Sequence, residues 1–154
     1  MNLGDILPRE AVIGDLRASS KKQLLQAIAE HAADLTGLSA REIFDTILQR
    51  EKLGSTGVGN GIAIPHGKFP NFDRITGVFA RLSAPIDFDA LDDQPVDLVF
   101  LLLAPESAGA DHLKALSRIA RLMRDPVRVA HLRATSDPDA LYDYLVSEPA
   151  SNAA

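Results

Sequence analysis

Apolar side chains recur at helical spacing in the N-terminal half of the chain. A first series, spaced by three and four residues, predicts one amphipathic helix: Leu24, Leu25, Ile28, Ala32 and Leu35. Ser19 or Ser20 caps the start of this helix, and Gly37 ends it. A second helix is predicted from Ser39, where Glu42 completes a capping box. Its apolar stripe consists of Ile43, Phe44, Ile47 and Leu48.

The middle of the chain has the pattern of strands rather than helices. Residues 62–64 predict a short strand that ends at Pro65, His66 and Gly67, and residues 75–82 predict a second strand. Residues 96–104 are almost continuously apolar and predict the most buried strand. Residues 84–94 are expected to hold a short edge strand. Residues 54–61 contain four glycines, so neither a helix nor a stable strand interior is expected there.

Helical spacing returns in the last third of the chain. One helix begins near Ala110 or Asp111, and its apolar positions are Leu113, Leu116, Ile119, Ala120 and Met123. Pro126 breaks it and starts a short successor, and Asp137 caps a final helix. Helices before and after the strands predict an α/β fold. We expect a single layered domain over residues 1–147, with a mixed central sheet of about four to five strands flanked by helices. Residues 148–154 are expected to be a frayed tail.

Composition excludes several classes of protein. The absence of cysteine among the 154 residues excludes disulfides, thiolate metal sites and cysteine nucleophiles. A formal net charge of −5 argues against nucleic acid as a partner. The longest apolar run, residues 98–104, is far shorter than the ~20 residues of a membrane helix, so no membrane insertion is expected. Because the N-terminus lacks the features of a signal peptide, a cytoplasmic location is expected.

The glycine-rich stretch at 54–61 does not match a nucleotide-binding motif. Gly54 and Gly59 have P-loop spacing, but Asn60 and Gly61 stand where lysine and serine or threonine are required. The dinucleotide motif fails too, since Ile62 occupies the place of its third glycine. The stretch also lies between a helix and a strand, which is the reverse order for both motifs. Its backbone N–H groups remain candidates for binding an anion.

Two histidines are candidates for chemistry. His66 lies between a rigid proline and a glycine at the end of a strand, and a neutral imidazole is a nucleophile at neutral pH. His112 begins a helix, where free N–H groups and the helix dipole favour an anion. His31 and His131 lie within predicted helices and are interpreted as structural residues.

Metal binding and hydrolysis are weaker interpretations of these histidines. The chain lacks the usual His-x3-His and His-Glu-x-x-His spacings, although His66 and His112 remain possible ligands together with Glu106 or Asp111. The Gly-x-Ser-x-Gly elbow of a serine hydrolase is also missing from the sequence. We therefore expect no cofactor.

Three segments together resemble a known protein family. Residues 50–68, REKLGSTGVGNGIAIPHGK, are similar to the active-site signature of type-2 EIIA domains. These domains belong to the mannitol/fructose class of the bacterial phosphoenolpyruvate-dependent phosphotransferase system (PTS). The resemblance continues through residues 89–98 and 112–116 and covers nearly the whole chain. Within this class the chain most resembles the nitrogen-regulatory EIIA branch.

The resemblance implies specific roles for residues of the site. His66 would be the phosphorylated histidine, His112 the second active-site histidine, and Arg50 an arginine that pairs with phosphoryl oxygens. Backbone donors from Gly59 to Gly61, with Asn60 between them, would cradle the phosphate. Phosphoryl transfer depends on such positioning and charge stabilisation, so no metal or nucleotide is required.

The resemblance also implies partners. An HPr-like phosphocarrier protein would donate the phosphoryl group, and the phosphorylation state of His66 would control regulatory target proteins. The alternative is a stand-alone sugar-specific EIIA component that passes the phosphate to an EIIB.

Overall fold

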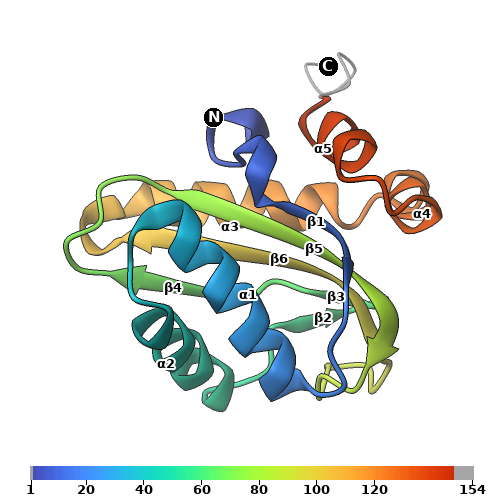
Figure 1. Ribbon diagram of the computed structural model, residues 1–154, viewed down its shortest axis with the longest axis horizontal. Coiled ribbons are helices and arrows are strands. Elements are labelled where there is room, and N and C mark those ends of the chain that lie inside the picture. The colour runs from blue at the N-terminus through green and yellow to red at the C-terminus, as the bar shows by residue number, and fades with distance from the viewer. Residues whose placement is uncertain (1, 148–154) are drawn as a thin grey trace.

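A mixed sheet of six strands forms the centre of the protein (Figure 1). The computed structural model describes residues 2–147. The strands are β1 (Val12–Leu16), β2 (Gly57–Gly59), β3 (Ile62–Ala63), β4 (His66–Phe69), β5 (Thr76–Ile86) and β6 (Val96–Pro105). Their order is β1-β5-β6-β3-β2, and β4 pairs with β6 farther along that strand than β3 does. The predicted α/β class and mixed sheet are confirmed, with more strands than expected.

Helices cover both faces of this sheet. Two of them, α1 (Lys21–Thr36) and α2 (Ala40–Lys52), lie on one face, and α3 (Ala110–Leu122) lies on the other (Figure 1). The C-terminal helices α4 (Pro126–Ala134) and α5 (Pro138–Val146) pack on each other, and α5 also contacts β1. Three short 3-10 helices complete the elements: η1 (Leu3–Asp5), η2 (Arg9–Ala11) and η3 (Glu106–Ala108).

The predicted helix boundaries agree with the capping observed. The Ser20 side chain accepts the Gln23 N–H at the start of α1, and Gly37 ends that helix in the left-handed conformation, with φ of 80°. Asp125 and Asp137 cap α4 and α5, each followed by proline at the first helical position. Side-chain acceptors and proline therefore satisfy or remove the free N–H groups at these helix starts.

Strand β6 is the axis of the core. Every residue of β6 except Asp97 is buried, and the strand pairs with β3, β4 and β5. Phe100 lies opposite Phe79 of β5, with the two ring centroids 6.1 Å apart in an edge-on arrangement. Apolar burial of this extent is the main force that stabilises a domain of this size.

Three sequence-based expectations about these strands were wrong or incomplete. Strand β1 was not predicted. Residues 84–94 do not form an edge strand of their own, because β5 simply continues to Ile86. His66 begins strand β4 rather than lying in the loop after a strand.

The glycine-rich stretch contains strand β2, although no strand interior was expected there. A Cβ atom at Gly57 would lie only 2.8 Å from the Ala90 Cβ, so glycine is required for the close approach of this strand to the 87–95 loop. The stretch is therefore a tight hairpin built from glycine, not an open connector.

The boundary at residue 147 stays a prediction. The expected frayed tail, residues 148–154, lies outside the described residues. Within residues 2–147, the structure contains no helix long and apolar enough to cross a membrane.

Gly14 tests the packing of the C-terminal helices against β1. A Cβ at this position would overlap the backbone carbonyl of Ser136, between α4 and α5. We expect Gly14→Ala to lower the free energy of unfolding by about 1–3 kcal/mol, measured by urea denaturation. The control is Gly4→Ala, whose Cβ would meet only Val146 atoms at an ordinary 3.8 Å. Equal stability of the two variants would contradict the packing described.

Candidate active site around His66

One pocket gathers residues from α2, β4 and α3. It has a volume of about 390 Å³ and is lined by Thr46, Gln49, Arg50, Leu53, His66, Gly67, Lys68 and His112. Among the described residues 2–147, strand β4 pairs only with β6, so its other side is an edge of the sheet where helices from the two faces meet. The structure thus brings together His66, His112 and Arg50, which are far apart in the sequence.

The imidazole of His66 is held in a defined tautomer. Its Nδ1 lies 2.9 Å from the carbonyl oxygen of Ile64. Because a carbonyl oxygen only accepts hydrogen bonds, Nδ1 carries the hydrogen and donates it. In the neutral ring this leaves the lone pair on Nε2, and the side chain is only half-buried. Nε2 is therefore the ring nitrogen whose lone pair is free.

Gly67 allows α2 to pack closely against β4. A Cβ atom at Gly67 would lie 2.9 Å from the Thr46 Cγ2 on α2. Arg50 is one helical turn beyond Thr46, so the same close packing carries its guanidinium to the pocket. Arg50 Nη1 donates a hydrogen bond of 2.8 Å to the carbonyl oxygen of Gly54, which fixes the direction of the side chain.

A buried carboxylate braces the turn that follows Arg50. The side chain of Glu51 is 2% exposed and lies 2.9 Å from the ammonium group of Lys21 on α1. It also accepts hydrogen bonds from the N–H and the hydroxyl of Thr56. A charge buried to this degree is stable only when it is paired and hydrogen-bonded, as Glu51 is. This brace ties α1, α2 and the 53–56 turn together behind the pocket.

His112 lies beside His66 in the first turn of α3. The two ring centroids are 5.7 Å apart, with an angle of 57° between the ring planes. His112 is buried, and its Nε2 has no hydrogen-bond partner among the described residues. Buried polar atoms are rarely left without a partner. The His112 ring therefore lies at the wall of the pocket with one nitrogen enclosed and unpaired.

Both histidines are kept neutral by their surroundings. Burial lowers the pKa of His66; the hydrogen bond to Ile64 opposes this shift, and the charge of Arg50 adds to it. Burial also lowers the pKa of His112, with further lowering from His66 and from Lys68. At neutral pH the pocket therefore offers neutral imidazoles with Arg50 and Lys68, and no carboxylate lines it. Such a set of groups favours an anionic ligand.

Lys68 and Leu53 line the pocket but were given no role by sequence reasoning. Lys68 belongs to the motif quoted for the family, and its spacing of two residues from His66 could have predicted that the two side chains share one site. Residues two apart on a strand face the same side, so a strand at residues 66–69 places His66 and Lys68 together.

Gly59, Asn60 and Gly61 are not brought into the pocket. Ile62 pairs with Leu98 and His66 with Leu102, so the hairpin turn lies roughly 13 Å from His66 along β6. The Asn60 N–H already donates to the carboxylate of Asp92, at 2.9 Å. These residues form the tight turn between β2 and β3, and their role in cradling phosphate stays a prediction that this placement does not support.

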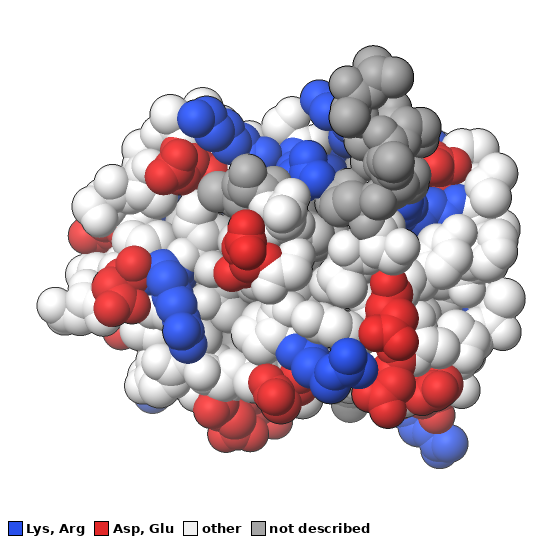
Figure 2. Space-filling view, turned by 90° about the horizontal axis from the view of Figure 1, so that it is seen from above, with Lys and Arg blue, Asp and Glu red and all other residues white. Residues whose placement is uncertain are grey.

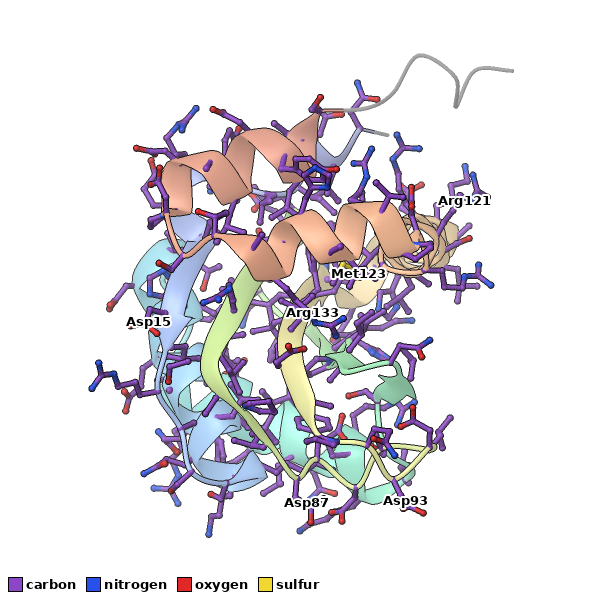
Figure 3. All side chains as sticks on the ribbon, turned by 90° about the vertical axis from the view of Figure 1, so that its right-hand side faces the viewer. Asp15, Asp87, Asp93, Arg121, Met123 and Arg133 are labelled. Atoms are coloured by element: carbon purple, nitrogen blue, oxygen red, sulfur yellow. The ribbon has the colours of Figure 1, made fainter. Side chains whose placement is uncertain are left out.

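An ion pair holds that turn at the other end of the sheet. Arg133 of α4 binds the Asp97 carboxylate through Nε, at 2.9 Å, and donates from Nη2 to the carbonyl oxygen of Asn60 at 2.6 Å (Figure 3). The positive φ of Asn60 and Gly61, 57° and 80°, explains the Asn-Gly sequence at the turn. The glycines and Asn60 thus give the backbone the conformation that this turn requires.

The remaining candidates of the sequence do not join the pocket. The Nε2 of His31 is hydrogen-bonded to the carbonyl oxygen of Glu10, and His131 stacks on Tyr144 with ring centroids 4.7 Å apart. Glu106 and Asp111 do not line the pocket. Over residues 2–147, no group of three or more His, Asp or Glu side chains is arranged to hold a metal ion.

Comparison with known proteins gives the same relationship over the full chain. Residues 5–148 match the family model described as "Phosphoenolpyruvate-dependent sugar phosphotransferase system, EIIA 2". The chain is 57% identical to a "Nitrogen regulatory protein" of Bradyrhizobium diazoefficiens over 99% of this chain and 100% of that protein. It is 44% identical to a "Nitrogen regulatory protein" of Escherichia coli K12 over 94% of this chain and 90% of that protein.

A solved structure agrees in fold as well as in sequence. The crystal structure of nitrogen regulatory protein IIA-Ntr from Neisseria meningitidis superposes with a TM-score of 0.88 and 37% identity. It covers 93% of this chain and 98% of that one. The family model and these relatives match nearly the whole chain, including all three segments of the predicted resemblance. The chain therefore belongs to the EIIA type-2 family of the phosphoenolpyruvate-dependent phosphotransferase system.

Proposed function

We propose that this protein is a phosphocarrier that accepts a phosphoryl group on Nε2 of His66 from an HPr-like protein. The observation that carries the proposal is the hydrogen bond from His66 Nδ1 to Ile64, which directs the Nε2 lone pair away from the backbone. The cationic pocket around this atom, free of carboxylates, supports the same chemistry.

The transfer is a direct exchange of one phosphorus–nitrogen bond for another. His66 Nε2 attacks the phosphorus of the donor's phosphohistidine, and the donor ring, protonated on its other nitrogen, leaves as neutral imidazole. The His66 ring keeps its Nδ1 hydrogen and becomes positively charged. The hydrogen bond to the Ile64 carbonyl strengthens as that charge develops, because charge-assisted hydrogen bonds are stronger. The ground-state contact thus stabilises the product of the transfer.

The neighbouring groups stabilise the phosphoryl oxygens. The ring of His112, with its centroid 5.7 Å from that of His66, would give the phosphoryl group an N–H hydrogen bond, and Arg50 would offset its negative charge. Both groups are fixed before the donor arrives, so little reorganisation is needed during transfer.

The output of the phosphorylated protein is regulatory in this proposal. Relatives that align over nearly the entire chain carry the name nitrogen regulatory protein, which favours control of nitrogen-related target proteins over sugar uptake through an EIIB. Phosphorylation adds up to about two negative charges to the pocket, enough to change which protein surface binds there. The protein would act in the cytoplasm.

Removal of the proposed acceptor tests the assignment. We expect His66→Ala to abolish phosphorylation by a phosphoenolpyruvate-driven relay of EI and HPr-type proteins, because it removes the imidazole whose Nε2 lone pair is free. Mass spectrometry of the acid-labile phosphate checks the result, with His31→Ala, outside the pocket, as the control. Phosphate mapped to His31 or His131 in the wild-type protein would refute the proposal.

Removal of the stabilising groups should slow transfer without removing the acceptor. We expect Arg50→Ala and His112→Ala each to raise the barrier by about 2–4 kcal/mol, which is a decrease of roughly 30- to 1000-fold in rate. Rapid-quench measurement of transfer from the phosphorylated donor gives the rate. Rates equal to wild type in both variants would return these residues to a purely structural role.

The lowered pKa values predict the behaviour of the site at acid pH. An NMR titration should give lower midpoints for His66 and His112 in the folded protein than in the same chain unfolded in urea. In the unfolded chain, histidine has a pKa of about 6.5. Arg50→Gln should raise the midpoint of His66, because it removes a charge that opposes protonation. The folded state disfavours the charged form of both rings, so the unfolded chain binds more protons below its histidine pKa. The free energy of unfolding should therefore decrease as the pH falls below about 6.5. Midpoints at or above the unfolded values would contradict this.

A further inference from the structure

A buried carboxylate lies directly behind the residues that line the pocket. Glu51 follows Arg50 at the end of α2, and its side chain is 2% exposed. The charged side chains on the face shown in Figure 2 are different, because they are interspersed at the surface in contact with solvent. Exposed ion pairs contribute little to stability. A carboxylate withdrawn from water is costly, and a buried ion pair is therefore weak evidence of a purely stabilising role.

Glu51 holds the turn whose carbonyl group binds Arg50. Its carboxylate accepts hydrogen bonds from the N–H and the hydroxyl of Thr56, and its own carbonyl oxygen accepts the Gly54 N–H at 3.1 Å. The carbonyl oxygen of Gly54 in turn accepts the hydrogen bond from Arg50 Nη1. Within residues 2–147, this is the only hydrogen bond of the Arg50 guanidinium. The direction of the guanidinium therefore depends on a turn that Glu51 anchors at both ends.

Lys21 keeps the Glu51 carboxylate from pairing with the guanidinium beside it. The ammonium group of Lys21 lies 2.9 Å from the carboxylate and 4.6 Å from the centroid of the Phe88 ring. The helices that carry the two charges, α1 and α2, pack on each other on one face of the sheet (Figure 1). Arg50 makes no ion pair with any other residue of the described range 2–147. Its positive charge thus stays available to a ligand of the pocket.

We propose that Glu51 is a positioning residue for the phosphoryl transfer, and that it acts through Arg50. By fixing Thr56 and Gly54, it holds the guanidinium where it meets the phosphoryl oxygens, although Glu51 itself does not line the pocket. Charges that are fixed in advance lower a barrier because they need no rearrangement during the reaction. This inference rests on the proposed function, since the position of Arg50 affects a rate only if a phosphoryl group is transferred there.

Removal of the carboxylate, compared with a destabilised control, separates positioning from stability. We expect Glu51→Ala to lower the kcat for transfer from the phosphorylated HPr-like donor about tenfold or more. The KM should stay unchanged, because Glu51 is buried behind the pocket and cannot touch a docked protein. The control is Gly14→Ala, which disturbs the packing of the C-terminal helices against β1 and should leave kcat unchanged. Equal kcat values in the two variants would overturn the proposal.

A milder variant covers the case in which Glu51→Ala does not fold. Thr56→Val retains the shape of the side chain and removes only the hydroxyl that donates to Glu51. The carboxylate keeps its ion pair with Lys21 and its hydrogen bond from the backbone N–H of residue 56. We expect kcat to fall about threefold or more, with KM unchanged. A wild-type kcat in Thr56→Val would contradict the positioning role.

A double-mutant cycle tests whether Glu51 acts through Arg50. In an Arg50→Ala background, the guanidinium that Glu51 positions is gone. We therefore expect Glu51→Ala and Thr56→Val to cause no further loss of kcat in that background. Losses that multiply, as they do for independent residues, would refute the action through Arg50. Failure of the wild-type protein to accept phosphate from the relay would instead refute the proposed function, and the positioning role with it.

Discussion

The parallel pairing of β4 with β6 is the constraint on which the site depends. The register that places His66 beside Leu102 fixes the acceptor at the sheet edge, next to the most buried strand of the molecule. Helices from the two faces of the sheet meet at that edge, so α2 supplies Arg50 and α3 supplies His112. A shift of one residue in this register would turn the imidazole to the opposite face of the sheet.

The local electrostatics follow from that placement. Burial against the sheet keeps both histidines neutral, and the Ile64 carbonyl decides which nitrogen of His66 is free. The positive charge that an anionic ligand requires comes from Arg50 and Lys68, whose side chains line the pocket. The Glu51–Lys21 ion pair stabilises the turn that holds Arg50. Glu51, which stabilises the fold, and Arg50, which lines the pocket, are thus neighbouring residues at the C-terminal end of α2.

The sequence predicted the helices well, because caps such as Ser20 and Asp137 and the spacing of apolar residues are local signals. It also predicted that His66, His112 and Arg50 would meet, through the family resemblance and the position of a helix after a buried strand. It did not predict β1, nor that Gly59 to Gly61 lie in a turn away from the pocket. Strand pairing is not local, and the need for glycine at Gly57 arises from Ala90, a residue 33 positions away. The tautomer of His66 likewise depends on a backbone carbonyl whose direction no sequence pattern gives.

The position of the phosphate on the His66 ring tests the central claim most directly. Long-range proton–nitrogen NMR correlation of the phosphorylated, ¹⁵N-labelled protein distinguishes the two ring nitrogens. The geometry predicts a phosphoryl group on Nε2 and a hydrogen retained on Nδ1, hydrogen-bonded to Ile64. A phosphoryl group on Nδ1 would require that hydrogen bond to break, and would contradict the proposed use of the site.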